Sequence, residues 1–186
     1  MKTLVEQNVV EELQTGGDEP VRLYVAACAE RMAPLFIALR TGETGRETDV
    51  ELYTDSVAGL WQTDRLLSDA AERAHLLDRF PELQSTEDGI TDVVGTYTFF
   101  ACLVLRYVLL ANGSGSADHA VSCGHAALTA MGMLDQNIAG AAFQADEQRL
   151  QTLSASGNAA GIWDASMAAG RERLRAVLSR VAKGTR

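Results

Sequence analysis

Residues 93–111 form an apolar run in which Arg106 is the only charged residue. Nineteen residues of this kind fit either a membrane span or the buried central helix of a helical domain. Acidic residues precede the run and a Gly/Ser segment follows it, so neither flank has the Lys/Arg cluster that orients a span. A cation inside a span is unfavourable by about 2.5–3.5 kcal/mol. We therefore expect no membrane insertion and a soluble bundle around a central helix at about 87–112.

Helical periodicity accounts for most of the remaining chain, and the alternation typical of strands is scarce. Besides the central helix, whose start is expected at 85–88, the predicted helices cover 3–14, 19–39, 47–62, 64–79, 117–140 and a final segment after a loop around 154–158. Pro34 is expected to kink or split the second helix near 32–33. The sequence thus predicts one all-α domain over 1–186, a bundle of about seven helices, with 1–18 as an N-terminal helix and linker.

Apolar stripes at helical spacing predict which faces are buried. In the helix over 19–39 the stripe consists of Tyr24, Cys28, Met32, Leu35 and Leu39. In the final helix it consists of Trp163, Met167, Leu174, Leu178 and Val181. Trp61 and Trp163 are accordingly expected to be core anchors rather than ligand platforms.

The charge is acidic and unevenly distributed. The net charge is −9, but residues 171–186 hold six Lys/Arg against Glu172, which makes +5 and leaves −14 for the other 170 residues. An acidic body repels phosphate, and cations at the end of a terminal helix complement its dipole and stay solvated, so nucleic-acid binding is not expected. The first residues lack a signal-peptide pattern, and three cysteines in apolar segments are typical of a reducing compartment. We expect a cytoplasmic protein.

No sequence motif indicates catalysis or a metal site. His119 and Cys123 are four residues apart and could share a ligand, but His125 lies about 240° from His119 around a helix, so the three cannot converge. Nucleophile-elbow, P-loop and dinucleotide-binding patterns are absent from the sequence. We predict no catalytic residue, no metal ligand and no cofactor.

Arg106 is the most informative single residue because a guanidinium within an apolar helix needs a carboxylate or several carbonyls. Asp92 and Phe99 lie on the same helical face as Arg106, at fourteen and seven residues before it. Together with Glu30 and Arg31, they are candidates for a ligand or partner groove. The alternative is a structural ion pair, or an arginine that reaches the end of the bundle.

Several short segments occur in the order and spacing of a known family. They are Cys28-Ala29-Glu30-Arg31-Met32-Ala33-Pro34, Thr41-Gly42, Leu60-Trp61-Gln62, Ala101-Cys102-Leu103-Val104-Leu105, His119-Ala120-Val121, Met133 with Ala139-Gly140, and Trp163. In these segments, over roughly 20–180, the chain resembles the YjaG-like family of uncharacterised bacterial helical proteins. It departs from the family at Leu35-Phe36, where Asn-Tyr is usual, and at Ala159-Ala160-Gly161, where acidic and aromatic residues are usual. The resemblance implies an all-α fold and supplies no catalytic residues.

The favoured interpretation is a non-enzymatic interaction protein whose acidic face binds a protein partner, because opposite charges speed association. An immunity or antitoxin-like role against a basic toxin is one form of it. An alternative interpretation is a small-molecule binder or enzyme with a polar groove around Arg106. A third is a structural homo-oligomer in which the helix of Trp163 packs across a dimer axis.

Overall fold

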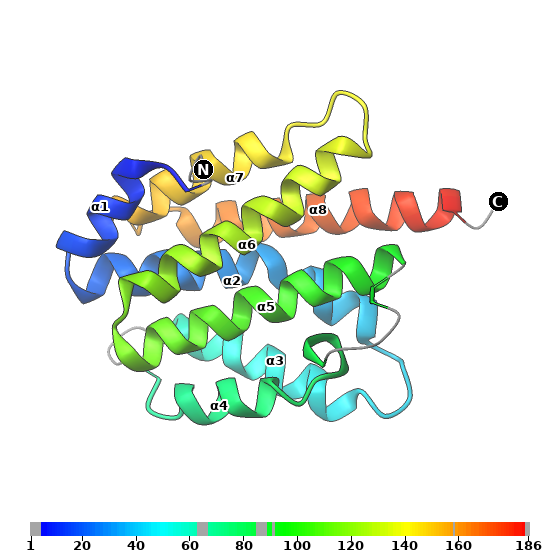
Figure 1. The fold of residues 1–186 in the computed structure, drawn as a ribbon, viewed down its shortest axis with the longest axis horizontal. Coiled ribbons are helices and arrows are strands. Elements are labelled where there is room, and N and C mark those ends of the chain that lie inside the picture. Colours follow the sequence, from blue (N-terminus) through cyan, green and yellow to red (C-terminus); the bar gives the residue numbers. More distant parts are fainter. Residues whose placement is uncertain (1–4, 63–66, 85–88, 91, 158, 185–186) are drawn as a thin grey trace.

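The chain folds as an all-α bundle (Figure 1), which confirms the fold class predicted from the sequence. The computed structural model describes residues 5–62, 67–84, 89–90, 92–157 and 159–184. Within these residues there are eight α-helices, one short 3₁₀ helix and no strand. They are α1 (Gln7–Thr15), α2 (Asp18–Arg40), α3 (Glu47–Leu60), α4 (Ala70–Leu77), η1 (Pro81–Leu83), α5 (Val93–Ser114), α6 (Ala117–Gln136), α7 (Phe143–Ala155) and α8 (Ile162–Gly184).

The apolar run forms α5, which lies in the middle of the bundle between α6 and α4 and in front of α2 (Figure 1). Asp92 begins the helix, because its carboxylate accepts a hydrogen bond from the Gly95 amide at 2.7 Å. Gly115, with φ 64°, ends it in the left-handed conformation. The start expected at 85–88 lies outside the described residues. Among the described helices, α5 alone is long and apolar enough to cross a bilayer. The same apolar composition is also typical of a helix that packs against several neighbours in a bundle, as α5 does.

α8 packs along α2, although the two helices are more than 120 residues apart in the sequence. Gly170 allows this approach, since a Cβ there would lie 3.0 Å from Cγ of Pro34 and 3.2 Å from the carbonyl oxygen of Arg31. A kink or a split of the helix was expected at Pro34. The helix is not split, since α2 continues past Pro34 to Arg40. The backbone hydrogen bond that proline removes is offset by the helices packed against α2 on several sides.

The buried stripe predicted for α2 is confirmed at four of its five positions. Tyr24, Cys28, Met32 and Leu35 are completely buried, and Leu39 is half-buried. The predicted helix over 64–79 is found as α4, which begins only at Ala70; residues 63–66 lie outside the described residues.

α7 occupies a segment for which the sequence predicts no helix, and α6 ends at Gln136 rather than at 140. The buried face of α7 contains Glu147, Gln151 and Ser154 beside Leu150 and Ala155. A buried face that is largely polar gives no apolar stripe, which is why periodicity does not reveal this helix.

The predicted rotation of α8 about its axis is wrong. Its buried positions are Ile162, Ser166, Ala169, Gly170, Arg173 and Val177. In the stripe expected to be buried, Trp163 and Leu178 are each 46% exposed. At 100° per residue the two stripes differ by about 100° around the helix. α8 therefore faces the core with an arginine and small residues, and Trp163 is not the core anchor expected.

Candidate functional site

The five residues proposed for a groove around Arg106 lie in separate environments. Arg106 forms an ion pair with Asp78, and both side chains are partly exposed, 33% and 41%. Asp92 caps the N-terminus of α5, fourteen residues or about 21 Å from Arg106 along the helix. The Phe99 ring contacts the edge of Phe100 at 5.2 Å between centroids. Arg106, Asp92 and Phe99 are therefore not brought together around one cavity.

Glu30 and Arg31 are adjacent in α2 but point into different sites. Glu30 is half-buried, and its Oε2 accepts a hydrogen bond from Nε1 of Trp61 at 2.9 Å. Burial raises the pKa of Glu30 above its usual value, although the Trp61 hydrogen bond acts in the opposite direction. Arg31 is completely buried and pairs with Glu147 rather than with Glu30. The ion pair expected at Arg31 exists, but its partner comes from a distant helix.

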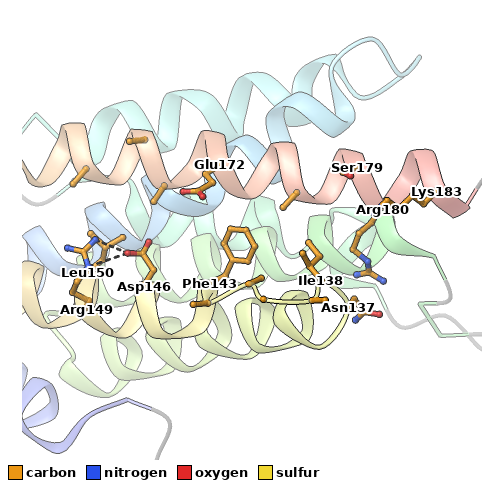
Figure 2. A pocket seen from close by; sticks show the side chains of 18 residues that line it. Asn137, Ile138, Phe143, Asp146, Arg149, Leu150, Glu172, Ser179, Arg180 and Lys183 are labelled. Atoms are coloured by element: carbon orange, nitrogen blue, oxygen red, sulfur yellow. Dashed lines mark hydrogen bonds and ion pairs between the residues drawn. The ribbon is translucent and has the colours of Figure 1, made fainter.

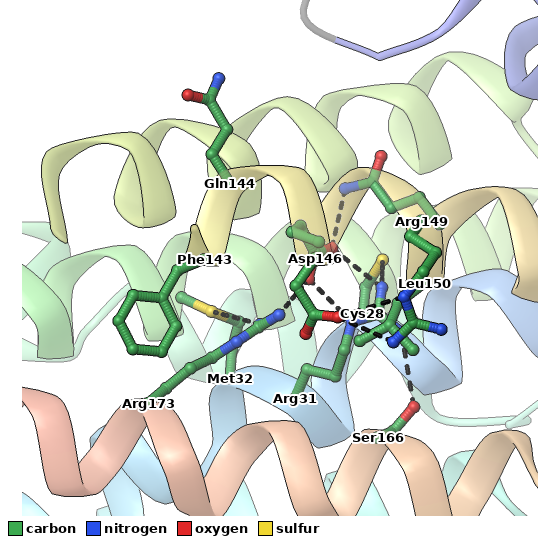
Figure 3. Close-up of polar contacts among 12 residues, drawn as sticks. Cys28, Arg31, Met32, Phe143, Gln144, Asp146, Arg149, Leu150, Ser166 and Arg173 are labelled. Atoms are coloured by element: carbon green, nitrogen blue, oxygen red, sulfur yellow. Dashed lines mark hydrogen bonds and ion pairs between the residues drawn. The ribbon is translucent and has the colours of Figure 1, made fainter. Parts of the chain in front are cut away.

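Arg31 belongs to a buried group of three charged residues, Arg31, Glu147 and Arg173, which we call the ionic network (Figure 3). Both guanidinium groups contact Glu147: Arg31 Nε and Nη2 donate to its two oxygens at 2.8 and 2.9 Å, and Arg173 Nη2 donates to Oε2 at 2.6 Å. All three side chains are 0–1% exposed. The network joins α2, α7 and α8 in the core.

Polar neighbours complete the ionic network. Gln151 Nε2 donates to Glu147 Oε1 at 2.8 Å and to the Gly124 carbonyl at 3.1 Å, and the Tyr24 hydroxyl donates to Gln151 Oε1 at 3.0 Å. Burial by itself raises the pKa of Glu147, but the two guanidinium groups and the hydrogen bonds outweigh it and lower the pKa to about 2. Arg31 has a raised pKa because its carboxylate partner outweighs the effect of burial. The network therefore stays charged at every ordinary pH.

The ionic network has the properties of a structural element. Its carboxylate already accepts four hydrogen bonds, so it is poorly suited to take a proton from a substrate. The nearby thiols are also unsuited to nucleophilic attack. Cys28 and Cys123 are buried, and burial raises the pKa of Cys123, so its thiolate is disfavoured. Among the described residues no group of three or more His, Cys, Asp and Glu is arranged to hold a metal ion.

Sequence reasoning missed two of the three network residues. Arg173 is 1% exposed, which overturns the expectation that all cations of 171–186 are solvated. Glu147 lies in the helix that was not predicted. One signal for this helix was available in the sequence. Glu147, Gln151 and Ser154 recur at helical spacing beside Leu150, which places their polar side chains on the same helical face as a residue expected to be buried.

The ionic network holds together the two helices that border a groove of about 950 Å³ between α7 and α8 (Figure 2). Along α8 the groove is lined by small side chains, namely Ala165, Ala168, Ala169, Ala176 and Ser179. On the opposite side Phe143 and Leu150 of α7 and the segment 137–142 complete it. The carboxylate of Asp135 fixes the start of α7 by accepting the amides of Phe143 and Gln144 at 2.7 and 3.0 Å.

The charged residues of this groove are sorted along its length (Figure 2). Asp146 and Glu172 lie toward one end, where Asp146 also pairs with Arg149 at 2.7 Å. Arg180 and Lys183 lie at the other end. Arg180 is held in place because its Nη1 donates to the Tyr97 hydroxyl at 3.0 Å and its guanidinium lies 5.9 Å from the centre of that ring. The groove is thus cationic at the Lys183 end, whereas toward the other end Asp146 and Glu172 lie with one cation, Arg149, which leaves a net charge of −1 there.

Comparison with known proteins identifies no relative: no protein-family model matches the chain, and neither does any curated protein or any solved structure. The resemblance to the YjaG-like family therefore stays a prediction. Functional conclusions depend on the geometry of the chain itself.

Proposed function

We propose that this protein is a non-enzymatic binding protein that holds an amphipathic helix of another protein in the α7–α8 groove. A single observation carries the proposal: the groove combines a floor of small side chains with opposite charges at its two ends. A soluble state and a cytoplasmic location, expected from the sequence, are part of this proposal.

The dimensions of the groove suit a helix. It follows α8 from Ala165 to Lys183, eighteen residues or about 27 Å, the length of a helix of about 18 residues. The alanine and serine side chains of α8 let the backbone of a bound helix approach closely. The Phe143 ring and the aliphatic side chain of Ile138 offer apolar contacts to the apolar stripe of that helix. A helix with an apolar stripe is therefore a better match than a flat or extended ligand.

The charges give the bound helix a direction. A helix is positive at its N-terminus and negative at its C-terminus, so the dipole directs its N-terminus to the acidic end of the groove and its C-terminus to the cationic end. The acidic end, with Glu172, would receive basic side chains from the first turns of the partner helix. The cationic end, with Arg180 and Lys183, would receive carboxylates from its last turns.

The net charge favours a basic partner. The body outside 171–186 has a net charge of −14, which attracts a positively charged protein over several ångströms before contact. An immunity-like role against a basic toxin is one form of this function. The groove provides the contact surface, and the acidic body increases the association rate.

Two synthetic peptides of 16 residues test the proposal. Both contain the same Ala/Leu stripe; one has lysines in its first two turns and glutamates in its last two, and the other has these charges exchanged. Binding is measured by fluorescence anisotropy with a label on each peptide. We expect the first peptide to bind at least about tenfold more tightly than the second, a difference of about 1.4 kcal/mol.

Two variants of the protein test whether the peptides bind in the α7–α8 groove. The double substitution Arg180→Glu with Lys183→Glu makes both ends of the groove acidic and is expected to abolish the preference between the two peptides. Arg79→Glu, at an exposed position after α4, changes one cation elsewhere and is expected to leave the preference unchanged. Equal binding of both peptides to the wild-type protein, or no binding of either up to about 1 mM, would contradict the proposal.

A further inference from the structure

α8 presents an apolar ridge to solvent on the side away from the core. Trp163 and Leu178 are each 46% exposed, and Met167 and Leu174 are half-buried. At 100° per residue these four positions fall within about 60° of one another, so they form a ridge along one side of the helix, in which Leu174 also packs against the core. Large exposed apolar side chains in a row mark an interaction surface more often than scattered ones do.

Beside this ridge a groove follows the outer face of α2. It consists of two adjoining cavities of about 320 and 400 Å³ that share Trp61. The floor is formed by residues of α2, and the walls come from α3 on one side and from the chain around the start of α8 on the other. The apolar lining residues include Leu23, Ala26, Ala33, Ile37, Val57 and Trp163, and the charged lining residues are Glu19, Arg22 and Glu30. We call this cavity pair the α2 groove.

The two rims of the α2 groove have opposite charges. On α8, Arg171 and Arg175 are exposed and lie next to the apolar ridge, about 80° and 120° from Trp163 around the helix. On α3, Glu51 and Asp55 are exposed and lie about 20° and 60° beyond Ala58, which lines the groove. Exposed basic residues of α8 and exposed acidic residues of α3 thus lie on the two helices that contribute walls to the groove; we call them the basic rim and the acidic rim.

We propose that this face is the interface of a homodimer with two-fold symmetry. In such an interface the same surface is used twice, so each feature must meet its complement on a second copy. The ridge of one copy enters the α2 groove of the other, and the reverse contact follows by symmetry. The same rotation puts Arg171 and Arg175 of each copy opposite Glu51 and Asp55 of the other.

A second copy fits this face better than an unrelated protein does because the surface complements itself in both shape and charge. The face offers a ridge and a groove, and two basic and two acidic residues. Tryptophans are frequent among the residues that dominate binding energy, and here Trp61 and Trp163 line the same cavity. The proposal does not depend on the function proposed above, since the α7–α8 groove uses the opposite side of α8.

Analytical ultracentrifugation of the full chain between 1 and 100 µM tests the dimer. The chain has a mass of 20.0 kDa, so we expect a species of about 40 kDa. Trp163→Ala and Leu178→Glu are each expected to raise the dimer dissociation constant by about 30-fold or more, as for residues at the centre of an interface. Leu153→Glu changes a leucine that is 38% exposed on α7 and is expected to leave the dimer intact. Circular dichroism checks that every variant remains helical.

Two charge-reversal variants test whether the two rims face each other in the dimer. A basic-rim variant, Arg171→Glu with Arg175→Glu, and an acidic-rim variant, Glu51→Arg with Asp55→Arg, should each be monomeric because like charges then face each other. Mixed in equal amounts, they should form a heterodimer, since every altered rim then meets its complement. A monomeric wild-type protein at 100 µM overturns the proposal. So does a dimer that Leu178→Glu and both rim variants leave unchanged, because that dimer would use another face.

Discussion

Glu147→Gln tests how far the ionic network stabilises the contact of α7 with α2 and α8. The Glu147 side chain is 0% exposed and accepts four hydrogen bonds, two from Arg31, one from Arg173 and one from Gln151. Glutamine has almost the same shape, so packing is preserved. Its amide nitrogen faces donors, however, and its neutral side chain leaves two guanidinium groups buried without a counter-charge.

The expected loss is large. Removing one partner of a buried ion pair costs about 3–5 kcal/mol, and a domain typically has about 5–15 kcal/mol of stability in total. In a domain of about 150–250 residues, each 1 kcal/mol lowers the melting temperature by about 2–4 °C. We therefore expect Glu147→Gln to melt about 6–20 °C below the wild type.

The same substitution should change the response to acid. The pKa of Glu147 is lowered from 4.5 to about 2 in the folded protein. Because the folded pKa lies below the unfolded one, the stabilisation is complete above about pH 4.5 and is lost as the pH falls through about 2. A difference of this size corresponds to about 3 kcal/mol. Glu147→Gln cannot titrate, so its stability should fall less steeply between pH 5 and pH 2.

Urea unfolding followed by circular dichroism at pH 7, 5 and 3 measures both effects. Asp146→Asn is the matched control, because Asp146 is the adjacent residue of α7 and its pair with Arg149 is exposed, 38% and 64%. It should cost less than about 1 kcal/mol. A triple variant, Arg31→Met, Glu147→Leu and Arg173→Met, removes all charges together and should recover most of the stability. The reasoning fails if Glu147→Gln costs under about 1 kcal/mol, or if the triple variant is less stable than Glu147→Gln.

Three further predictions concern packing, the surface and the thiols. Gly124→Ala should lower the free energy of unfolding by about 1–3 kcal/mol in urea, because the new methyl group overlaps with the Tyr24 hydroxyl; an unchanged midpoint would contradict this. Arg106→Ala should cost less than about 1 kcal/mol in the same assay, since its pair with Asp78 is partly exposed; a loss above 2 kcal/mol would show that the pair is not the surface contact described. Cys123 should resist iodoacetamide until the protein is unfolded, as mass spectrometry can show, because burial raises its pKa; rapid alkylation of the folded protein would refute it.

The fold class could be predicted from the sequence because it depends on local information. A helix that is apolar on nearly all sides must be shielded from water, and the other helices of the chain provide this shielding. The caps of α5 are also local, since Asp92 and Gly115 act within a few residues of the helix they end. α7 escaped prediction because its buried face is polar, and only its partners in other helices make that face suitable for the core.

The candidate site could be predicted only in part, for the same reason. The sequence indicates that Arg31 needs an ion pair, but its partner Glu147 is 116 residues away. In the sequence Arg173 cannot be told from the other cations of the basic end of α8. Only the orientation of α8 in the fold brings it to Glu147. The exposed apolar ridge of α8 results from that orientation: pairing of Arg173 turns Trp163 and Leu178 outward.

The long separation between Arg31 and its partners has a consequence for biosynthesis. α2 leaves the ribosome early, whereas Glu147 and Arg173 are translated at least 116 residues later. At about 5–20 residues per second, Arg31 remains without its counter-ion Glu147 for about 6–23 seconds. Final packing of α2 must therefore follow the translation of α8. Until α6 has also been translated, the part of α5 that packs against it is exposed, and a chaperone can bind this apolar surface.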